Sequence, residues 1–201
     1  GEGNRRAFAV DLRDAGVQVA EGPWISRGLA AVDSRSVDFD CVPAVPVGGE
    51  NWYLERDGFA WGGIGVAAVW YGGAVAVARR LFQASRQRTP DQIAQALIGA
   101  ADLSLQAAAR MLAGAAAEVD AGRAAGESGA LRAQRGRGAV ADAVERVLTA
   151  AAHGLGPGPL TTEEEHARRI ADLQVYVRQH HAERDHASLG KLLLAREEEP
   201  W

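Results

Sequence analysis

Residues 58–87 restrict the fold more than any other segment, because they are almost entirely apolar and rich in small side chains. Gly62, Gly63, Gly65, Gly72 and Gly73 interrupt this run, and each glycine costs roughly 1 kcal/mol of helix propensity relative to alanine. A helix of this composition is stable where other helices pack closely against its small residues. It is typical of the interior of a helix bundle or of a contact between subunits.

Further helices are predicted downstream of this segment. Thr89-Pro90-Asp91 marks a helix start, in which Thr89 caps the helix, Pro90 suits the first turn and Asp91 favours the dipole. That helix is expected to run to about Ala121, and residues 122–129 are expected to form a loop. Later helices are predicted at about residues 130–153, at 161–182 with a Thr161/Thr162 cap, and at 185–197.

The first 48 residues have the pattern of β-strands. Strands are predicted at Ala7–Val10, at Val17–Val19 and at Ser36–Asp40, where polar and apolar residues alternate. Pro43 and Pro46 are expected to stop the last strand, since proline cannot donate to a ladder. The sequence therefore predicts a mostly helical α+β chain, with a β segment at 1–48 followed by an up-down four-helix bundle at 49–201.

Composition excludes several classes of function. The net charge of −4 argues against general attraction to nucleic acid. Cys41 is the single cysteine, which excludes an internal disulfide and a cysteine-based zinc site; we expect it to be buried and the protein to be cytoplasmic. No uninterrupted apolar run reaches the ~20 residues of a membrane span, and the histidine spacing suggests no metal site. The basic cluster at 132–137 is interpreted as a solvated helix start.

Two short motifs are candidates for a functional site. The turn His153-Gly-Leu-Gly-Pro-Gly158 would let backbone amides approach a phosphate group, although a plain turn between helices has the same composition. The adjacent His180 and His181 are candidates for a general base, because the ordinary pKa of histidine lies near working pH. Either could instead cap a helix or pair with Glu183 or Asp185 on the surface. Glu183 is the nearest alternative base, whereas Asp185 is expected to form a solvated pair with Arg184.

The motifs follow one another in an order that resembles the second half of an acyl-CoA dehydrogenase. In the β segment the matching stretches are Gly16-Val17, Arg27-Gly28-Leu29, Val37-Asp38-Phe39 and Val42-Pro43. In the helical part the glycine turn is similar to the Gly-Gly-x-Gly loop of that family. The stretch from Arg169 and Asp172 through Tyr176 to His180 and His181 is similar to the helix that follows the loop.

This resemblance implies an FAD-dependent oxidoreductase that acts on an acyl-CoA or related acyl thioester by α,β-dehydrogenation. His180 falls where the family carries its catalytic glutamate, and His181 and Glu183 are the next candidates. Arg86, in the stretch Arg86-Gln87-Arg88, would contact a flavin phosphate. Gly154, Gly156 and Gly158 would contact the adenine dinucleotide of a neighbouring subunit. We expect the histidines and the glycine turn to border one cavity for the flavin ring.

The same resemblance implies assembly, because the family's N-terminal half is not represented in these residues. We expect a homo- or hetero-oligomer in which a second chain or a further segment supplies that half. Two alternatives remain open. One is a flavin-dependent monooxygenase of the same fold, in which the histidine pair manages protons at an oxygenated flavin. The other is a catalytically silent partner subunit, since the family's glutamate and its Arg-x-Gln-Phe-Gly motif are not intact here.

Overall fold

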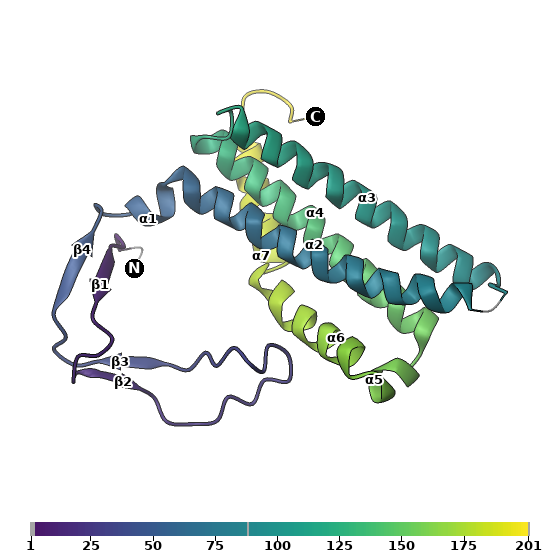
Figure 1. Cartoon of the computed structure of the whole chain (residues 1–201). Coiled ribbons are helices and arrows are strands. Elements are labelled where there is room, and N and C mark those ends of the chain that lie inside the picture. The colour runs from purple at the N-terminus through teal and green to yellow at the C-terminus, as the bar shows by residue number, and fades with distance from the viewer. Residues whose placement is uncertain (1–2, 88, 201) are drawn as a thin grey trace.

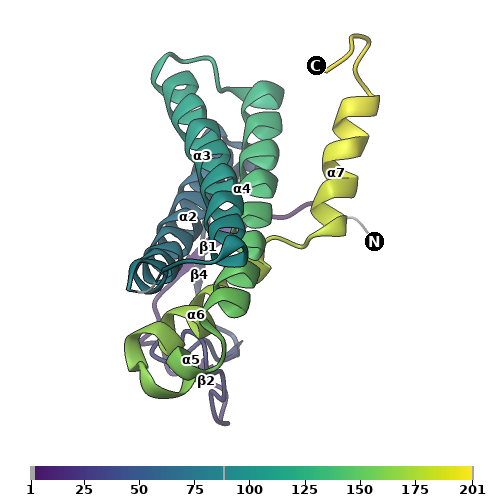
Figure 2. The ribbon, with the colours of Figure 1, turned by 90° about the vertical axis from the view of Figure 1, so that its right-hand side faces the viewer.

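The computed structural model describes residues 3–87 and 89–200 as a helical bundle joined to an extended β segment (Figure 1). Three long helices lie side by side along most of the bundle, and shorter helices cross beside them. The helices are α1 Trp52–Glu55, α2 Asp57–Arg86, α3 Gln92–Asp120, α4 Gly126–Leu155, α5 Gly158–Thr162, α6 Glu164–Tyr176 and α7 Glu183–Leu194, with a 3-10 turn η1 at Val177–Gln179 between the last two. Helix α7 lies beside α4 at the edge of the bundle (Figure 2) and has no buried residue.

The observed helix ends differ from the predicted ones where a side chain supplies a better cap. Asp91, not Thr89, caps α3, because its carboxylate accepts a hydrogen bond from the Ala94 amide at 2.8 Å. Helix α4 begins four residues earlier than expected, since the Asp57 carboxylate accepts from the Gly126 amide at 2.6 Å. The Thr162 hydroxyl donates to a carbonyl within α5 rather than capping the next helix.

The core is a narrow seam of small and β-branched side chains. From α2 it takes Ala67, Trp70, Ala74 and Val77, spaced three and four residues apart as one face of a helix requires. On α3 the buried positions are alanines at every seventh residue, 94, 101, 108 and 115, a repeat that keeps one small face towards its neighbours. Small side chains at these positions let the helix backbones approach closely.

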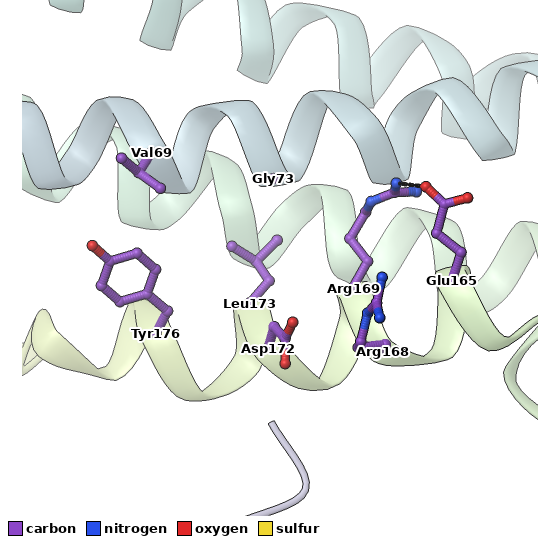
Figure 3. Close-up of a pocket in the computed structure, with 8 residues that line it drawn as sticks. All are labelled: Val69, Gly73, Glu165, Arg168, Arg169, Asp172, Leu173 and Tyr176. Carbon is purple, nitrogen blue, oxygen red and sulfur yellow. Dashed lines mark hydrogen bonds and ion pairs between the residues drawn. The ribbon is translucent and has the colours of Figure 1, made fainter. Parts of the chain in front are cut away.

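Only some of the glycines in α2 serve this close packing. A Cβ at Gly73 would lie 3.1 Å from the Leu173 side chain of α6, a contact visible in Figure 3. Around Gly62, Gly65 and Gly72, by contrast, a Cβ would meet nothing within 4 Å. The expectation of close packing therefore holds for one face of α2, and the other glycine face is open in this chain.

Helix α2 is long and apolar enough, by length and composition alone, to cross a membrane. Its apolar residues do not form one uninterrupted run, so the sequence expectation did not include it. About a quarter of its most apolar stretch is buried here, at 28%. Core helices of soluble proteins meet the same criterion, so this is a weak indication of a membrane span.

The β segment forms two separate antiparallel ladders. Strand β1 (Ala7–Val10) pairs with β4 (Ala44–Val47), and β2 (Val17–Val19) pairs with β3 (Val37–Phe39). Strand β3 ends at Phe39, before Pro43, as expected, but Pro46 does not act as a strand stop, because it lies within β4 opposite Phe8. Proline is tolerated there because each ladder has only two strands and leaves one edge of β4 unpaired. The division into domains at residue 48 stays a prediction.

One close contact docks the β segment on the bundle. The Leu29 amide donates to the Asp172 carboxylate of α6 at 2.6 Å. Gly28 lies so near α6 that a Cβ there would be 2.0 Å from the Ala171 carbonyl oxygen, and Gly28 is the one buried residue among positions 3–50. Two stretches that carry the family resemblance, Arg27-Gly28-Leu29 and the helix around Asp172, are thus in direct contact.

Replacing Gly28 by alanine should detach the β segment from α6. The new methyl group would overlap backbone, which cannot move aside as a side chain can, at a cost of about 1–3 kcal/mol. We expect the Leu29 amide to lose its protection from hydrogen exchange while α2 and α4 keep theirs. Gly49→Ala is the matched control, since a Cβ there meets nothing within 4 Å. Unchanged protection at Leu29 in Gly28→Ala would contradict this docking.

Candidate functional site

The two adjacent histidines lie in a turn between helices, not on a helix. Helix α6 ends at Tyr176, the 3-10 turn η1 follows, and His180 has extended backbone. The prediction of a helix running to residue 182 was wrong, because Ala182 adopts positive φ (48°) and a new helix starts after it. Asp185 favours that start, since its carboxylate accepts from the His181 amide at 3.2 Å. Residues 180–185 are called the histidine segment below.

The two imidazoles have different environments. His180 is buried, with 7% of its surface exposed, and burial lowers its pKa while the nearby Asp185 carboxylate opposes the shift. The side chain of His181 is 65% exposed. Glu183, the other candidate base, is an exposed residue of the first turn of α7. At neutral pH His180 is therefore an uncharged imidazole, able to accept a proton.

Asp185 lies between the two histidines. One carboxylate oxygen is 3.8 Å from His180 Nε2 and the other is 3.5 Å from His181 Nδ1. The expectation of a solvated pair with Arg184 was wrong in this respect, and the alternative in which a histidine pairs with Asp185 describes the contact better. Sequence reasoning did not predict that one carboxylate would lie near both imidazoles.

His186 completes this cluster from the first turns of α7. Its ring centroid is 5.3 Å from that of His180. Both rings face Gly138 of α4, where a Cβ would be in ordinary van der Waals contact with each Nε2 at 3.8 Å. Among residues 3–87 and 89–200, no group of three His, Cys, Asp or Glu side chains is placed to hold a metal ion.

Arg137 of α4 ties the histidine segment to the bundle. Its guanidinium donates to the Gln179 carbonyl at 2.9 Å and to the Gly63 carbonyl of α2 at 3.3 Å, and it stacks over the Trp70 ring at 4.8 Å. Desolvation lowers the pKa of this guanidinium, although arginine remains charged. The interpretation of the basic cluster 132–137 as a solvated helix start was therefore wrong for Arg137.

A cavity of about 730 Å³ opens beside the histidine segment. The first turns of α2 and the N-terminal part of α4 form its walls, with an apolar lining that includes Tyr53, Leu54, Phe59 and Val66. Its polar lining consists of Arg56, Gln134, Arg137, Gln179, His181 and Asp185. A smaller cavity of about 130 Å³ lies behind it and is lined by His180. His181 thus borders a ligand-sized cavity, whereas His180 borders the small one.

The glycine turn lies at the other end of α2 and α4. Gly154 is a packing residue, since a Cβ there would be 2.5 Å from Leu81 Cδ1. Gly156 ends α4 with φ of 65°, and neither Gly156 nor Gly158 has an atom within 4 Å of a Cβ. No side chain covers the Cα of Gly156 or Gly158, but the Gly156 amide donates to the Ala152 carbonyl at 3.1 Å and the Gly158 carbonyl accepts from the Thr161 and Thr162 hydroxyls.

Arg80, not Arg86, is the arginine nearest the glycine turn. Arg80 and Gly154 line one cavity of about 230 Å³, and Arg80 forms a two-bonded ion pair with Glu163 at 2.6 and 2.8 Å. Arg86 is exposed and stacks on Phe82, one turn back, at 5.8 Å. Arg88, which belongs to the same sequence stretch, lies outside the described residues.

The histidine segment and the glycine turn are far apart. Arg137 holds the segment against Gly63, whereas the cavity at the glycine turn is lined by Ala84 of the same helix. At 1.5 Å per residue along the helix, Gly63 and Ala84 are about 30 Å apart. The expectation that both motifs border one flavin-ring cavity was wrong for a single chain.

Comparison with known proteins identifies the architecture. Butyryl-CoA dehydrogenase from Megasphaera elsdenii matches 94% of this chain with a TM-score of 0.80 and 21% identity, over 51% of its own length. Acyl-CoA dehydrogenase from Slackia heliotrinireducens matches 94% at 0.77 and 19%, over 52%. A probable acyl-CoA dehydrogenase from Mycobacterium abscessus matches 85% at 0.72 and 18%, over 47%. No protein-family model and no curated protein matches the sequence.

The chain therefore has the fold of the C-terminal half of acyl-CoA dehydrogenases, as the sequence resemblance predicted. It spans about half the length of the solved chains that it matches. At this level of sequence identity the likeness establishes the fold, and activity has to be argued from the residues of the chain itself.

The buried histidines predict that acid weakens the fold. Burial lowers the folded-state pKa of both His180 and His166, so the unfolded chain binds protons more readily. Stability is then complete above the unfolded value of about 6.5 and falls as the pH drops below it. We expect Tm to fall between about pH 7.5 and 5.5, and to fall less in His180→Asn.

The exposed His153 supplies the control for this prediction. His153→Asn should keep the pH dependence of the unmodified protein. A Tm that does not change over this pH range, or an identical fall in His180→Asn, would show that His180 is not buried in its neutral form.

Proposed function

We propose that this chain is part of a flavin-dependent oxidoreductase of the acyl-CoA dehydrogenase type, which removes hydrogen from the α and β carbons of an acyl thioester. The observation that supports this most is the fold shared with butyryl-CoA dehydrogenase over 94% of the chain. A ligand-sized cavity bordered by an imidazole supports it further. Acyl-CoA as the substrate, FAD as the cofactor and a cytoplasmic location are parts of this proposal.

The residues at the glycine turn fit a flavin dinucleotide in part. No side chain stands over Gly156 or Gly158, which suits a close approach by a ligand, although the Gly156 amide already donates to the Ala152 carbonyl. Arg80, which is paired with Glu163, is the cation that borders the neighbouring cavity. Gly154 does not fit, because Leu81 covers it, and Arg86 points away along its own helix. A bound flavin would supply the acceptor for the hydride that leaves the β carbon.

Within this function, His181 is the best-placed base. It lines the 730 Å³ cavity, and Asp185 lies beside its Nδ1, which leaves Nε2 available to take the α proton. The carboxylate then stabilises the imidazolium. His180 lies behind this pair in the small cavity, and Glu183 borders neither cavity. In this proposal the imidazole of His181 does the work of the family's glutamate.

Because Gly63, at the histidine segment, and Ala84, at the glycine turn, are about 30 Å apart along α2, we propose that one chain serves two flavins. The histidine segment would face the ring of one flavin, and the glycine turn would hold the dinucleotide of another in a neighbouring subunit. The open glycine face of α2 is a candidate contact for such an assembly.

The exposed apolar side chains of the β segment support the proposal that another chain or segment supplies the N-terminal half of the acyl-CoA dehydrogenase fold. Its apolar side chains are largely exposed, among them Phe8 at 56%, Phe39 at 53% and Val45 at 67%, and Cys41, which was expected to be buried, is exposed too. Two-stranded ladders alone are marginal in water, and a strand-bearing partner would cover these faces.

Hydrogen exchange tests this requirement. In the isolated chain, we expect the amides of β1 to β4 to exchange far faster than those of α2 and α4, because little apolar surface covers them. Addition of the N-terminal half of an acyl-CoA dehydrogenase from the same source should slow exchange in the strands. Strand protection equal to that of α4 in the isolated chain would contradict the need for a partner.

Reconstitution with that half tests the reaction. The complex should bind flavin, and acyl-CoA added without oxygen should bleach it. His181→Ala should slow bleaching by about 10²–10⁴-fold, as expected for loss of a general base, while flavin binding is retained. Arg110→Ala is the control, because Arg110 is exposed on α3 and borders neither the 730 Å³ cavity nor the cavity at the glycine turn.

The alternatives predict different results in the same experiment. A monooxygenase would not bleach with acyl-CoA and would need reduced flavin and oxygen. A silent partner subunit would give turnover that is unchanged in the double variant His180→Ala/His181→Ala. Absence of flavin from the complex would refute the proposal.

A further inference from the structure

The 730 Å³ cavity contains a half-buried cation that forms no direct ion pair among the described residues. Burial lowers its pKa, and the Asp185 carboxylate in the same cavity opposes this shift from a longer distance. Arg137 lines the cavity, yet both hydrogen bonds of its guanidinium go to backbone carbonyls. Among the residues that the structure describes, no carboxylate lies within the 4.0 Å of an ion pair with Arg137. A guanidinium has five N–H donors in a planar fork, so three remain for a further partner.

The one carboxylate in the cavity is already engaged. Asp185 accepts from the His181 amide and lies within 3.8 Å of both imidazoles of the histidine segment. Arg56 adds a second positive charge at the α1 side, where it stacks over Tyr53 at 4.6 Å and Trp52 at 5.6 Å. The two arginines exceed the single carboxylate in charge, so the cavity carries net positive charge.

The opposite wall is apolar and partly aromatic. Tyr53, Leu54, Phe59 and Val66 line it, and the ring of Tyr53 packs against that of Phe59 at 5.7 Å. Gly58, Gly62 and Gly63 also line the cavity and add no side chain to it. The wall thus suits an acyl or aryl group, and the positive charge suits an acid group on the same molecule.

We propose that this cavity binds a carboxylic acid with an apolar or aromatic body, and that Arg137 binds its carboxylate. A carboxylate matches the planar fork of a guanidinium with two parallel hydrogen bonds. The gain in binding free energy is large where the cation is already desolvated, because folding has already removed water from the arginine. This inference goes beyond the proposed function, since it concerns a ligand bound by this chain alone, without flavin or partner.

A pair of ligands that differ only in charge tests the inference. Titration calorimetry of the chain would compare 4-phenylbutyrate with 4-phenylbutanamide, which have the same body and nearly the same shape. We expect the acid to bind at least tenfold more tightly than the amide, with the advantage reduced by high salt. Equal affinity for the two ligands, or no binding of the acid at millimolar concentration, would overturn the proposal.

Variants then assign the effect to Arg137. Arg137→Met should abolish the preference for the acid, and Arg137→Lys, which keeps the charge but loses the fork, should retain part of it. Arg135→Met is the matched control, because it removes the same charge from α4 while Arg135 contacts the Pro200 carbonyl and lies outside the cavity. Retention of the full preference in Arg137→Met would also overturn the proposal. The comparison of acid and amide in the unmodified protein holds even where Arg137→Met fails to fold.

Discussion

The indole of Trp70 is the contact on which both the core and the candidate site depend. It is completely buried where α2, α4 and α6 meet, with Tyr176 of α6 edge-on at 6.1 Å and Arg137 of α4 over its face at 4.8 Å. The small residues of the seam let the three backbones close around this large ring. Because Arg137 stacks on the ring and also holds the Gln179 carbonyl, the position of the histidine segment is set by the packing of the core.

Composition, periodicity and capping chemistry predicted the long helices and strands β1 to β3, but not α1 or β4, and the order of motifs predicted the resemblance that the fold confirms. The small-residue composition of α2, the apolar spacing of α3 and the helix start at Thr89-Pro90-Asp91 are local signals that need no knowledge of three-dimensional contacts. The errors concern positions that nonlocal contacts decide. Asp57 extends α4 across a sequence separation of 69 residues, and no local signal predicts this.

The same distinction between local and nonlocal signals explains which residues of the candidate site the sequence could predict. Arg137 resembled a solvated residue because glycines and alanines flank it, yet its neighbour Gly63 lies 74 positions away and leaves room for its side chain. Arg80 was missed in favour of Arg86 because the choice followed a motif, whereas proximity to Gly154 depends on how α2 and α4 pack. Asp185 alone had a local signal, its spacing from His181, which was read as surface pairing.

Buried surface is distributed unevenly between the helical bundle and the β segment. The buried side chains of α2, α3 and α4 pack against one another, so the bundle has its own core. The β segment does not, since one glycine is its single buried residue, and its ladders leave edges and apolar faces uncovered. The docking of Gly28 and Leu29 on α6 fixes where that segment lies relative to the bundle. A partner that covers the strands would therefore be brought to a fixed place beside α6, on a surface that the bundle has already positioned.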